Sequence, residues 1–288
     1  MPSDPSPEKK KKRPHPLEAP PEPRRVELDD NGKPKQQVIL HIPVVKPTVT
    51  QALVAINSII FFVAFYVLDG WQHNDLYSWG ANNQYQVLNL GEYHRLITAM
   101  FLHGNLMHIV FNMYALWAIG QTVERFFGHT RFLLIYFLGG LGGSILSVLL
   151  NGPNVESVGA SGAVFAIFGA EIVFLYKHQK LLGRMAQAQL RQLIIIAGMN
   201  FAVGILSSFN TVGPSIDNWG HIGGLLGGLA IAWMIGPLFI PQRHPSAPDD
   251  LTIFDLNPLD RKYQHLLAYL SGLLVILIMG TLLARGGF

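Results

Sequence analysis

Residues 157–176 read SVGASGAVFAIFGAEIVFLY and contain a single charged side chain. A run of this length and composition can cross the hydrocarbon core of a bilayer as one helix. Gly162, Ala166 and Ala170 recur at four-residue spacing, so they lie on one face of that helix. Stripes of small residues let two membrane helices approach closely. The stretch therefore predicts a tightly packed membrane helix with the hydroxyl of Ser161 near its start.

The whole chain has the composition of a membrane protein. Of its 288 residues, 50% are hydrophobic and 14% are charged, and the mean hydropathy is +0.30. Six further stretches free of Lys, Arg, Asp and Glu are long enough to span a bilayer, namely 47–68, 96–123, 132–155, 192–216, 218–242 and 263–284. These patterns predict an all-α polytopic membrane protein with a six-helix bundle and one appended C-terminal transmembrane helix.

Basic residues are distributed unevenly between the two sides of the predicted bundle. Of the 21 Lys and Arg, all except Arg95 and Arg285 fall on the side that carries the N-terminus. By the positive-inside rule, the N-terminus is expected in the cytoplasm and the C-terminus outside. We therefore expect an integral, multi-pass protein of a prokaryotic plasma membrane that contacts anionic lipid at the cytoplasmic face. Nucleic acid is not an expected partner, because the positive charge is explained by orientation.

Two polar segments, at 1–46 and 241–262, separate the predicted membrane-spanning parts of the chain. Residues 1–36 hold nine of the 18 prolines and a KKKKR run, so 1–46 is predicted to be a disordered basic cytoplasmic tail. The six-helix core covers 47–240, a cytoplasmic linker 241–262, and the seventh helix 263–288. Cysteine is absent, which excludes disulfides and thiolate zinc sites.

Polar side chains inside the predicted spans gather at one depth. His108 and Asn112 are four residues apart in the second span and share a face, Ser161 opens the fourth span, and His221 opens the sixth. With the predicted orientation, all of these spans run inward, so His108, Ser161 and His221 lie within about 10 Å of their outer ends. Asn112 lies one turn deeper. Polar groups in a membrane are costly, so such a cluster indicates function.

These four residues suit acyl transfer. Ser161 can attack a carbonyl carbon, and His221 can take its proton and return it to the leaving amine. His108, Asn112 and the Ser161 backbone N–H can donate to the oxyanion that develops. The glycine stripe in GHIGGLLGG (220–228) would let the sixth helix contact the stripe that follows Ser161. That contact is expected to bring Ser161 within hydrogen-bond reach of His221.

Several motifs resemble a known family. The sequence is similar to the rhomboid intramembrane serine proteases in GASGAVFAIFGA (159–170), which has their GxSG motif, in HGNLMHIVFNM (103–113) and in GHIGGLLGG. EYHRLITAMF and TVERFFG also match, so the resemblance covers about residues 50–240. The resemblance implies a rhomboid fold in its six-plus-one form, a catalytic dyad of Ser161 and His221, and oxyanion donation by His108 and Asn112. It implies transmembrane protein substrates and no cofactor.

The chain departs from the family pattern at two positions. The family often has Trp directly before the arginine of its first loop, where this chain has His94 before Arg95. It also often has Tyr four residues after the serine, where this chain has Phe165. An aromatic stack on His221 remains available to Phe165, without a phenol hydroxyl.

Other interpretations of the same residues remain open at this point. A catalytically silent rhomboid-like protein that binds transmembrane clients is the main alternative, and a transporter is a further one. His103, His108 and His221 could suggest zinc, although no HExxH motif or accompanying carboxylate is present. Asp217 is interpreted as the N-cap of the sixth helix rather than as a third catalytic residue. Glu171 lies about 15 Å deeper than Ser161, too far to be its base.

Overall fold

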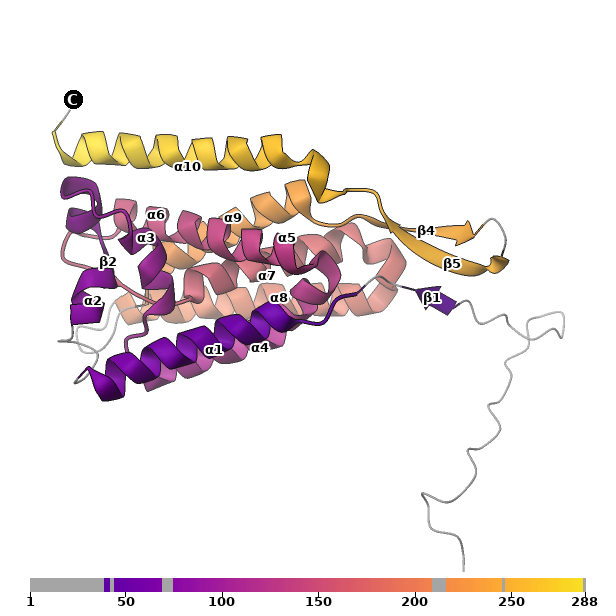
Figure 1. The fold of residues 1–288 in the computed structure, drawn as a ribbon, viewed down its shortest axis with the longest axis horizontal. Helices are drawn as coiled ribbons and strands as arrows, with labels where there is room; N and C mark the ends of the chain where they lie inside the picture. Colours follow the sequence, from indigo (N-terminus) through magenta and orange to yellow (C-terminus); the bar gives the residue numbers. More distant parts are fainter. Residues whose placement is uncertain (1–38, 42–43, 69–74, 209–215, 245–246, 287–288) are drawn as a thin grey trace, which may run out of the picture.

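The computed structural model describes residues 39–41, 44–68, 75–208, 216–244 and 247–286. Long helices run side by side along the long axis of the molecule (Figure 1). They are α1 (Thr48–Phe62, continued by a π-helical turn, Val63–Val67), α4 (Leu106–Phe127), α5 (His129–Leu134, continued through the π-helical turn η4, Ile135–Gly139, into α6, Gly140–Leu150), α7 (Ser161–Lys177), α8 (Gln179–Ser208, interrupted at Gly183), α9 (Asn218–Ile235) and α10 (Tyr263–Ala284). The predicted all-α polytopic architecture is confirmed.

The described helices differ in how they meet the membrane. Five helical segments are long and apolar enough to span it, Thr48–Val67, Leu106–Phe127, His129–Leu150, Gln179–Ser207 and Tyr263–Ala284. The remaining two, α7 and α9, have 17 and 18 residues and are rich in glycine and alanine. Twelve residues of α7 are buried, so this helix lies at the centre of the bundle.

Backbone contact between α6, α7 and α9 confirms the predicted role of the small residues. A Cβ added at Gly224 would overlap the carbonyl oxygen of Gly162, and one added at Gly228 would overlap that of Ala166. A Cβ at Gly143 in α6 would lie 2.6 Å from the carbonyl oxygen of Gly220. Glycine is needed at these crossings because any larger residue would hold the helices apart.

Capping side chains fix the starts of two helices. Asn105 accepts a hydrogen bond from the His108 backbone N–H at 2.8 Å, so α4 begins at Leu106. Asp217 accepts one from the Gly220 N–H at 2.8 Å and so caps α9. Both caps lie at the end of the bundle where α7 begins, which we call the Ser161 end.

The start of α1 is capped by a residue of another helix. Glu124, near the end of α4, is 0% exposed, and its carboxylate accepts hydrogen bonds from the backbone N–H groups of Val49 at 2.8 Å and Thr50 at 2.7 Å. The Thr50 hydroxyl donates to it at 2.6 Å, and a ring nitrogen of His129 lies 2.6 Å from it. Pro47, at the N-cap of α1, makes no side-chain cap. The end of α4 therefore satisfies the first turn of α1.

A small sheet lies at the opposite end of the bundle from α2 and β2 (Figure 1). Strands β4 (Phe239–His244) and β5 (Ala247–Asp255) form an antiparallel hairpin inside the predicted linker, and β1 (Ile39–His41) pairs parallel with β5. Residues 39–41 lie within the stretch predicted to be a disordered tail, and they form β1 because the edge of β5 offers backbone hydrogen bonds that any sequence can accept. Residues 1–38 of the predicted tail lie outside the described residues.

Short elements fold the segment between α1 and α4 against the Ser161 end. They are α2 (Asp75–Gly80), β2 (Asn82–Asn83), the π-helical turn η2 (Tyr85–Asn89), α3 (Arg95–Thr98) and the 3-10 turn Ala99–Phe101. β2 pairs antiparallel with β3 (Glu156–Ser157), the strand that precedes α7. The pairing attaches this loop to the segment that leads into Ser161.

Candidate active site

Ser161 is the first residue of α7, and the segment before it is fixed by its backbone. Gly159 has φ +127°, a conformation that other residues adopt only with strain. Its N–H donates to the Ala99 carbonyl oxygen at 2.9 Å. The chain then turns into the helix, so the backbone N–H groups of the first turn and the positive end of the helix dipole lie beside the serine.

His221 lies in the first turns of α9, which packs directly on α7. Its ring stacks on Phe165 with 4.4 Å between ring centroids and 20° between ring planes. Phe165 is four residues after Ser161, so the stack holds the histidine on the face of α7 that carries the serine. The side chain is 8% exposed, and its Nδ1 atom has no hydrogen-bond partner among the described residues. The stack that the sequence left available to Phe165 is thus present.

His108 and Asn112 approach the same segment from α4. A Cβ added at Gly159 would lie 2.6 Å from Nε2 of His108 and 3.5 Å from Nδ2 of Asn112. The amide nitrogen of Asn112 is buried and has no partner among the described residues. The structure therefore brings His108 and Asn112 against the residue that lies two before Ser161. Buried donors without partners are rare, so the Asn112 amide marks this place as a candidate site for a bound hydrogen-bond acceptor.

Asp217 is engaged in structural hydrogen bonds. Besides capping α9, its carboxylate accepts from the Ser157 hydroxyl at 2.5 Å and from the Asn151 amide at 2.9 Å. These bonds join the start of α9 to β3 and to the end of α6. The interpretation of Asp217 as an N-cap is confirmed.

His103, three residues before the start of α4, is buried. It is 3% exposed, and its ring meets that of His108 edge-on with 5.2 Å between centroids. Burial, together with the nearby His108, lowers the pKa of His103 to about 3. His103 is therefore neutral at physiological pH. Within the described ranges, no group of three or more His, Asp or Glu residues is arranged to hold a metal ion.

Sequence reasoning missed a small cavity beside Ser161. It has a volume of about 20 Å³, room for roughly one water molecule. Its polar lining includes Asn82, Ser144 and Ser157 as well as Ser161. The Asn82 amide donates to the Ser144 carbonyl oxygen at 3.0 Å, which connects β2 to α6. The sequence feature that could have indicated this polar pocket is Ser144, within the GGS of 142–144.

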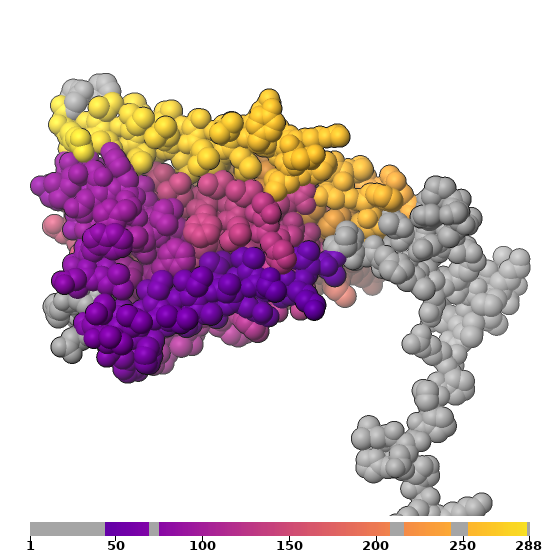
Figure 2. Space-filling view, viewed as in Figure 1, coloured from indigo at the N-terminus to yellow at the C-terminus, as the bar shows by residue number. Residues whose placement is uncertain are grey.

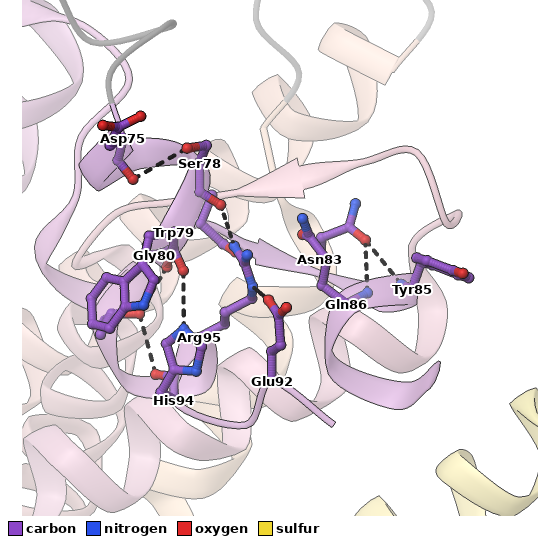
Figure 3. A network of polar contacts seen from close by, with 12 residues as sticks. Asp75, Ser78, Trp79, Gly80, Asn83, Tyr85, Gln86, Glu92, His94 and Arg95 are labelled. Carbon is purple, nitrogen blue, oxygen red and sulfur yellow. Dashed lines mark hydrogen bonds and ion pairs between the residues drawn. The ribbon is translucent and has the colours of Figure 1, made fainter. Parts of the chain in front are cut away.

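Arg95 organises the loop that covers this end of the bundle (Figure 3). It is 5% exposed, and its guanidinium donates to the carbonyl oxygens of Ser78 at 2.8 Å and Ala81 at 2.9 Å and to the Glu92 carboxylate at 2.6 Å. The neighbouring His94 ring stacks on Trp79 at 4.6 Å. The histidine that stands at the family's tryptophan position thus contributes an aromatic contact within the loop.

Glu171 lies within the bundle, as expected from its depth below Ser161. It is 3% exposed, and its carboxylate accepts a hydrogen bond from the Gln189 amide at 2.6 Å. This bond joins α7 to α8 and gives Glu171 a structural partner far from the serine.

Comparisons with known proteins point to one family. The model of the Rhomboid domain family matches residues 90–238, which include all four residues of the candidate site. Rhomboid protease GluP of Bacillus subtilis (strain 168) is 37% identical over 194 residues, which is 66% of this chain and 35% of that protein. RHOMBOID-like protein 6, mitochondrial, of Arabidopsis thaliana is 40% identical over 163 residues, 57% of this chain and 50% of that protein.

A third relative is covered more completely. Putative rhomboid protease YdcA of Bacillus subtilis (strain 168) is 33% identical over 144 residues, 50% of this chain and 68% of that protein. The chain spans about a third of the length of GluP and half of RHOMBOID-like protein 6. Since the family model matches more than half of its 288 residues, the chain belongs to the rhomboid family.

Proposed function

We propose that this protein is an intramembrane serine endopeptidase that cleaves transmembrane segments of membrane proteins. The observation that supports the proposal is the stack of His221, in α9, on Phe165 of α7. Phe165 lies one turn after Ser161 on the same helix. The unpartnered Nδ1 of His221 and amide of Asn112 add to it, because buried polar atoms without partners cost free energy that a bound polar backbone would recover.

The roles follow from the chemistry of each group. Ser161 attacks the scissile carbonyl carbon while His221 accepts the hydroxyl proton, and the tetrahedral intermediate carries its negative charge on the former carbonyl oxygen. His108, Asn112 and the Ser161 N–H donate to that oxygen, and losing one such donor typically costs about 3 kcal/mol. His221 then protonates the leaving amine. Water, deprotonated by His221, hydrolyses the resulting ester and restores the Ser161 hydroxyl.

The position of the site within the bundle constrains the substrate. A transmembrane helix hides its carbonyl groups in its own hydrogen bonds, so a short segment must unwind before Ser161 can reach it. We therefore expect substrates with helix-weakening residues near the cut. The chemistry requires no cofactor. The N-terminus is placed in the cytoplasm, with its basic residues at anionic lipid, and the site faces the outer half of a prokaryotic plasma membrane.

A fluorophosphonate probe tests the nucleophile directly in purified, detergent-solubilised protein. Wild type is expected to be labelled at Ser161, and Ser161→Ala and His221→Ala should each lose labelling and cleavage of a model transmembrane substrate. Ser58→Ala, which removes an exposed hydroxyl that bonds only its own helix, and His265→Ala, at an exposed position, are matched controls that should be labelled normally. Labelling of Ser161→Ala at the wild-type rate would overturn the proposal.

The same experiment separates the protease from a silent binding protein. A silent rhomboid-like protein would bind transmembrane segments without labelling or cleavage. The presence of both Ser161 and His221 in the chain favours the enzyme. A folded wild type that binds a model substrate but neither reacts with the probe nor cleaves would establish the alternative.

A further inference from the structure

The last helix, α10, lies on the flank of the bundle. No residue of α10, the whole of which the structure describes, is buried. It runs from the hairpin end to the Ser161 end, where its last turn lies beside the loop between α1 and α4 (Figures 1 and 2). Such slight packing makes the few specific contacts of this helix informative.

The contacts at the Ser161 end join α10 to η2. The Arg285 side chain, just after α10, donates through Nε to the carbonyl oxygen of Leu88 at 2.8 Å. The Asn89 amide donates in return to the Ala284 carbonyl oxygen at 3.3 Å. Below these bonds, Leu277 of α10 packs against the small apolar cluster that contains Leu88. The end of α10 and the turn η2 thus hold each other by polar and apolar contacts.

A second anchor fixes α10 along its length. The Tyr269 hydroxyl donates to the carbonyl oxygen of Leu138, in the π-helical turn η4, at 3.2 Å. The Tyr269 hydroxyl oxygen would lie 2.6 Å from a Cβ at Gly227 and 2.8 Å from one at Gly142, so it sits where α6 and α9 cross. Tyr269 therefore fixes the position of α10 along its axis relative to α6 and α9. Arg285 then fixes the position of η2 relative to α10.

A short series of contacts continues from η2 to the serine. The Asn83 side chain accepts a hydrogen bond from the Tyr85 backbone N–H at 2.9 Å, which fixes the start of η2 to β2 (Figure 3). β2 pairs with β3, whose last residue, Ser157, precedes Ser161 by four positions. These hydrogen bonds and the strand pairing, followed by four residues of chain, connect α10 to Ser161.

We infer that α10 is a positioning element for the active site and that Arg285 is its positioning residue. By holding η2, α10 keeps β2 and β3 in register and so fixes the segment that presents Ser161. The activity readouts of this inference rest on the proposed function. The physical consequence is a local one: without the contacts of α10, the segments around 82–98 and 156–161 should open more often, while the rest of the bundle stays folded.

The test compares single and double variants of the full chain in detergent. Arg285→Ala removes the donor, Leu277→Ala removes the apolar contact, and Arg285→Lys restores a cationic donor. Leu283→Ala is the matched control, because this side chain is in the last turn of α10 and is 64% exposed. Hydrogen exchange of peptides covering 82–98 and 156–161 and the rate of fluorophosphonate labelling of Ser161 are measured in parallel.

Arg285→Ala should speed exchange in both peptides by about five-fold, the effect of one lost hydrogen bond. Combining it with Leu277→Ala should increase the effect. The labelling rate and kcat should fall with KM unchanged, because the reacting geometry and not substrate binding is loosened. Arg285→Lys should recover most of both losses, and Leu283→Ala should behave as wild type.

The outcomes distinguish this inference from the proposed function. Exchange that rises in 82–98 but leaves 156–161 and the labelling rate unchanged would overturn the positioning role. Unchanged exchange in both peptides for the double variant would overturn it as well. If exchange rises in both peptides but no variant, wild type included, reacts with the probe, the structural coupling stands and the proposed protease function fails.

Discussion

Replacing Gly224 by alanine tests whether the contact between α7 and α9 holds both the fold and the site together. The added Cβ would overlap the carbonyl oxygen of Gly162, a backbone atom that cannot rotate away. The two helices must therefore separate. Gly198→Ala in α8 is the matched control, because a Cβ there meets nothing within 4 Å.

The expected magnitude follows from two opposing effects. Overpacking of a tight contact typically costs about 1–3 kcal/mol. Alanine in a helix is favoured over glycine by about 1 kcal/mol, which stabilises both variants. Gly224→Ala should therefore be less stable than Gly198→Ala by about 2 kcal/mol. That difference corresponds to a Tm lower by about 4–8 °C in a protein of this size.

The same separation should slow the chemistry. It moves His221, on α9, away from Ser161, on α7, and a misplacement of about 1 Å can cost about 10²-fold in rate. Thermal unfolding followed by circular dichroism and the rate of fluorophosphonate labelling measure the two effects. The reasoning is refuted if Gly224→Ala unfolds at the same temperature as Gly198→Ala and is labelled at the same rate.

Two further predictions concern the histidines of α4 and its entrance. His108→Ala should lower the kcat/KM plateau by about 10²-fold, because the proposed oxyanion donor is lost. The pH midpoint of kcat/KM, measured from pH 5 to 9, should move by less than about one unit, and a larger shift would assign proton transfer to His108. The pKa of His103 is about 3 in the folded protein against an ordinary 6.5, so the unfolded state binds the extra proton and stability falls as the pH drops from 6.5 towards 3. By pH 5 this costs about 2 kcal/mol. The loss of Tm between pH 7 and pH 5 should therefore be smaller in His103→Asn than in wild type, and equal losses would contradict the assigned burial.

Much of the helical bundle could be predicted from the sequence because the patterns that specify it are local. Length and hydropathy locate the spans, and the Asp217 cap locates the start of α9. The small-residue stripes predicted the contact of α7 with α9 because only glycine and alanine allow backbones to touch. The four polar residues of the candidate site were proposed from the common depth in the membrane that their spans predict.

The features that could not be predicted from the sequence depend on residues that are far apart along the chain. The hairpin of β4 and β5 lies in a polar, proline-containing stretch, and β1 joins it across about 200 residues of sequence. The turn η2 is held by Arg285, 197 residues after Leu88. The burial of His103 depends on how the loop before α4 folds back, which no local pattern specifies. Such features need the tertiary structure.

The cap on the first turn of α1 has a consequence for how the protein is inserted. Glu124 lies 75 residues after Val49, so α1 is synthesised and placed in the membrane before its capping carboxylate exists. In that interval the N–H groups of its first turn must be satisfied by water or lipid headgroups, and nothing specific sets how deep the helix sits. When α4 arrives, its carboxylate fixes α1 at one depth. α1 thus takes its final depth from α4, a helix that is synthesised after it.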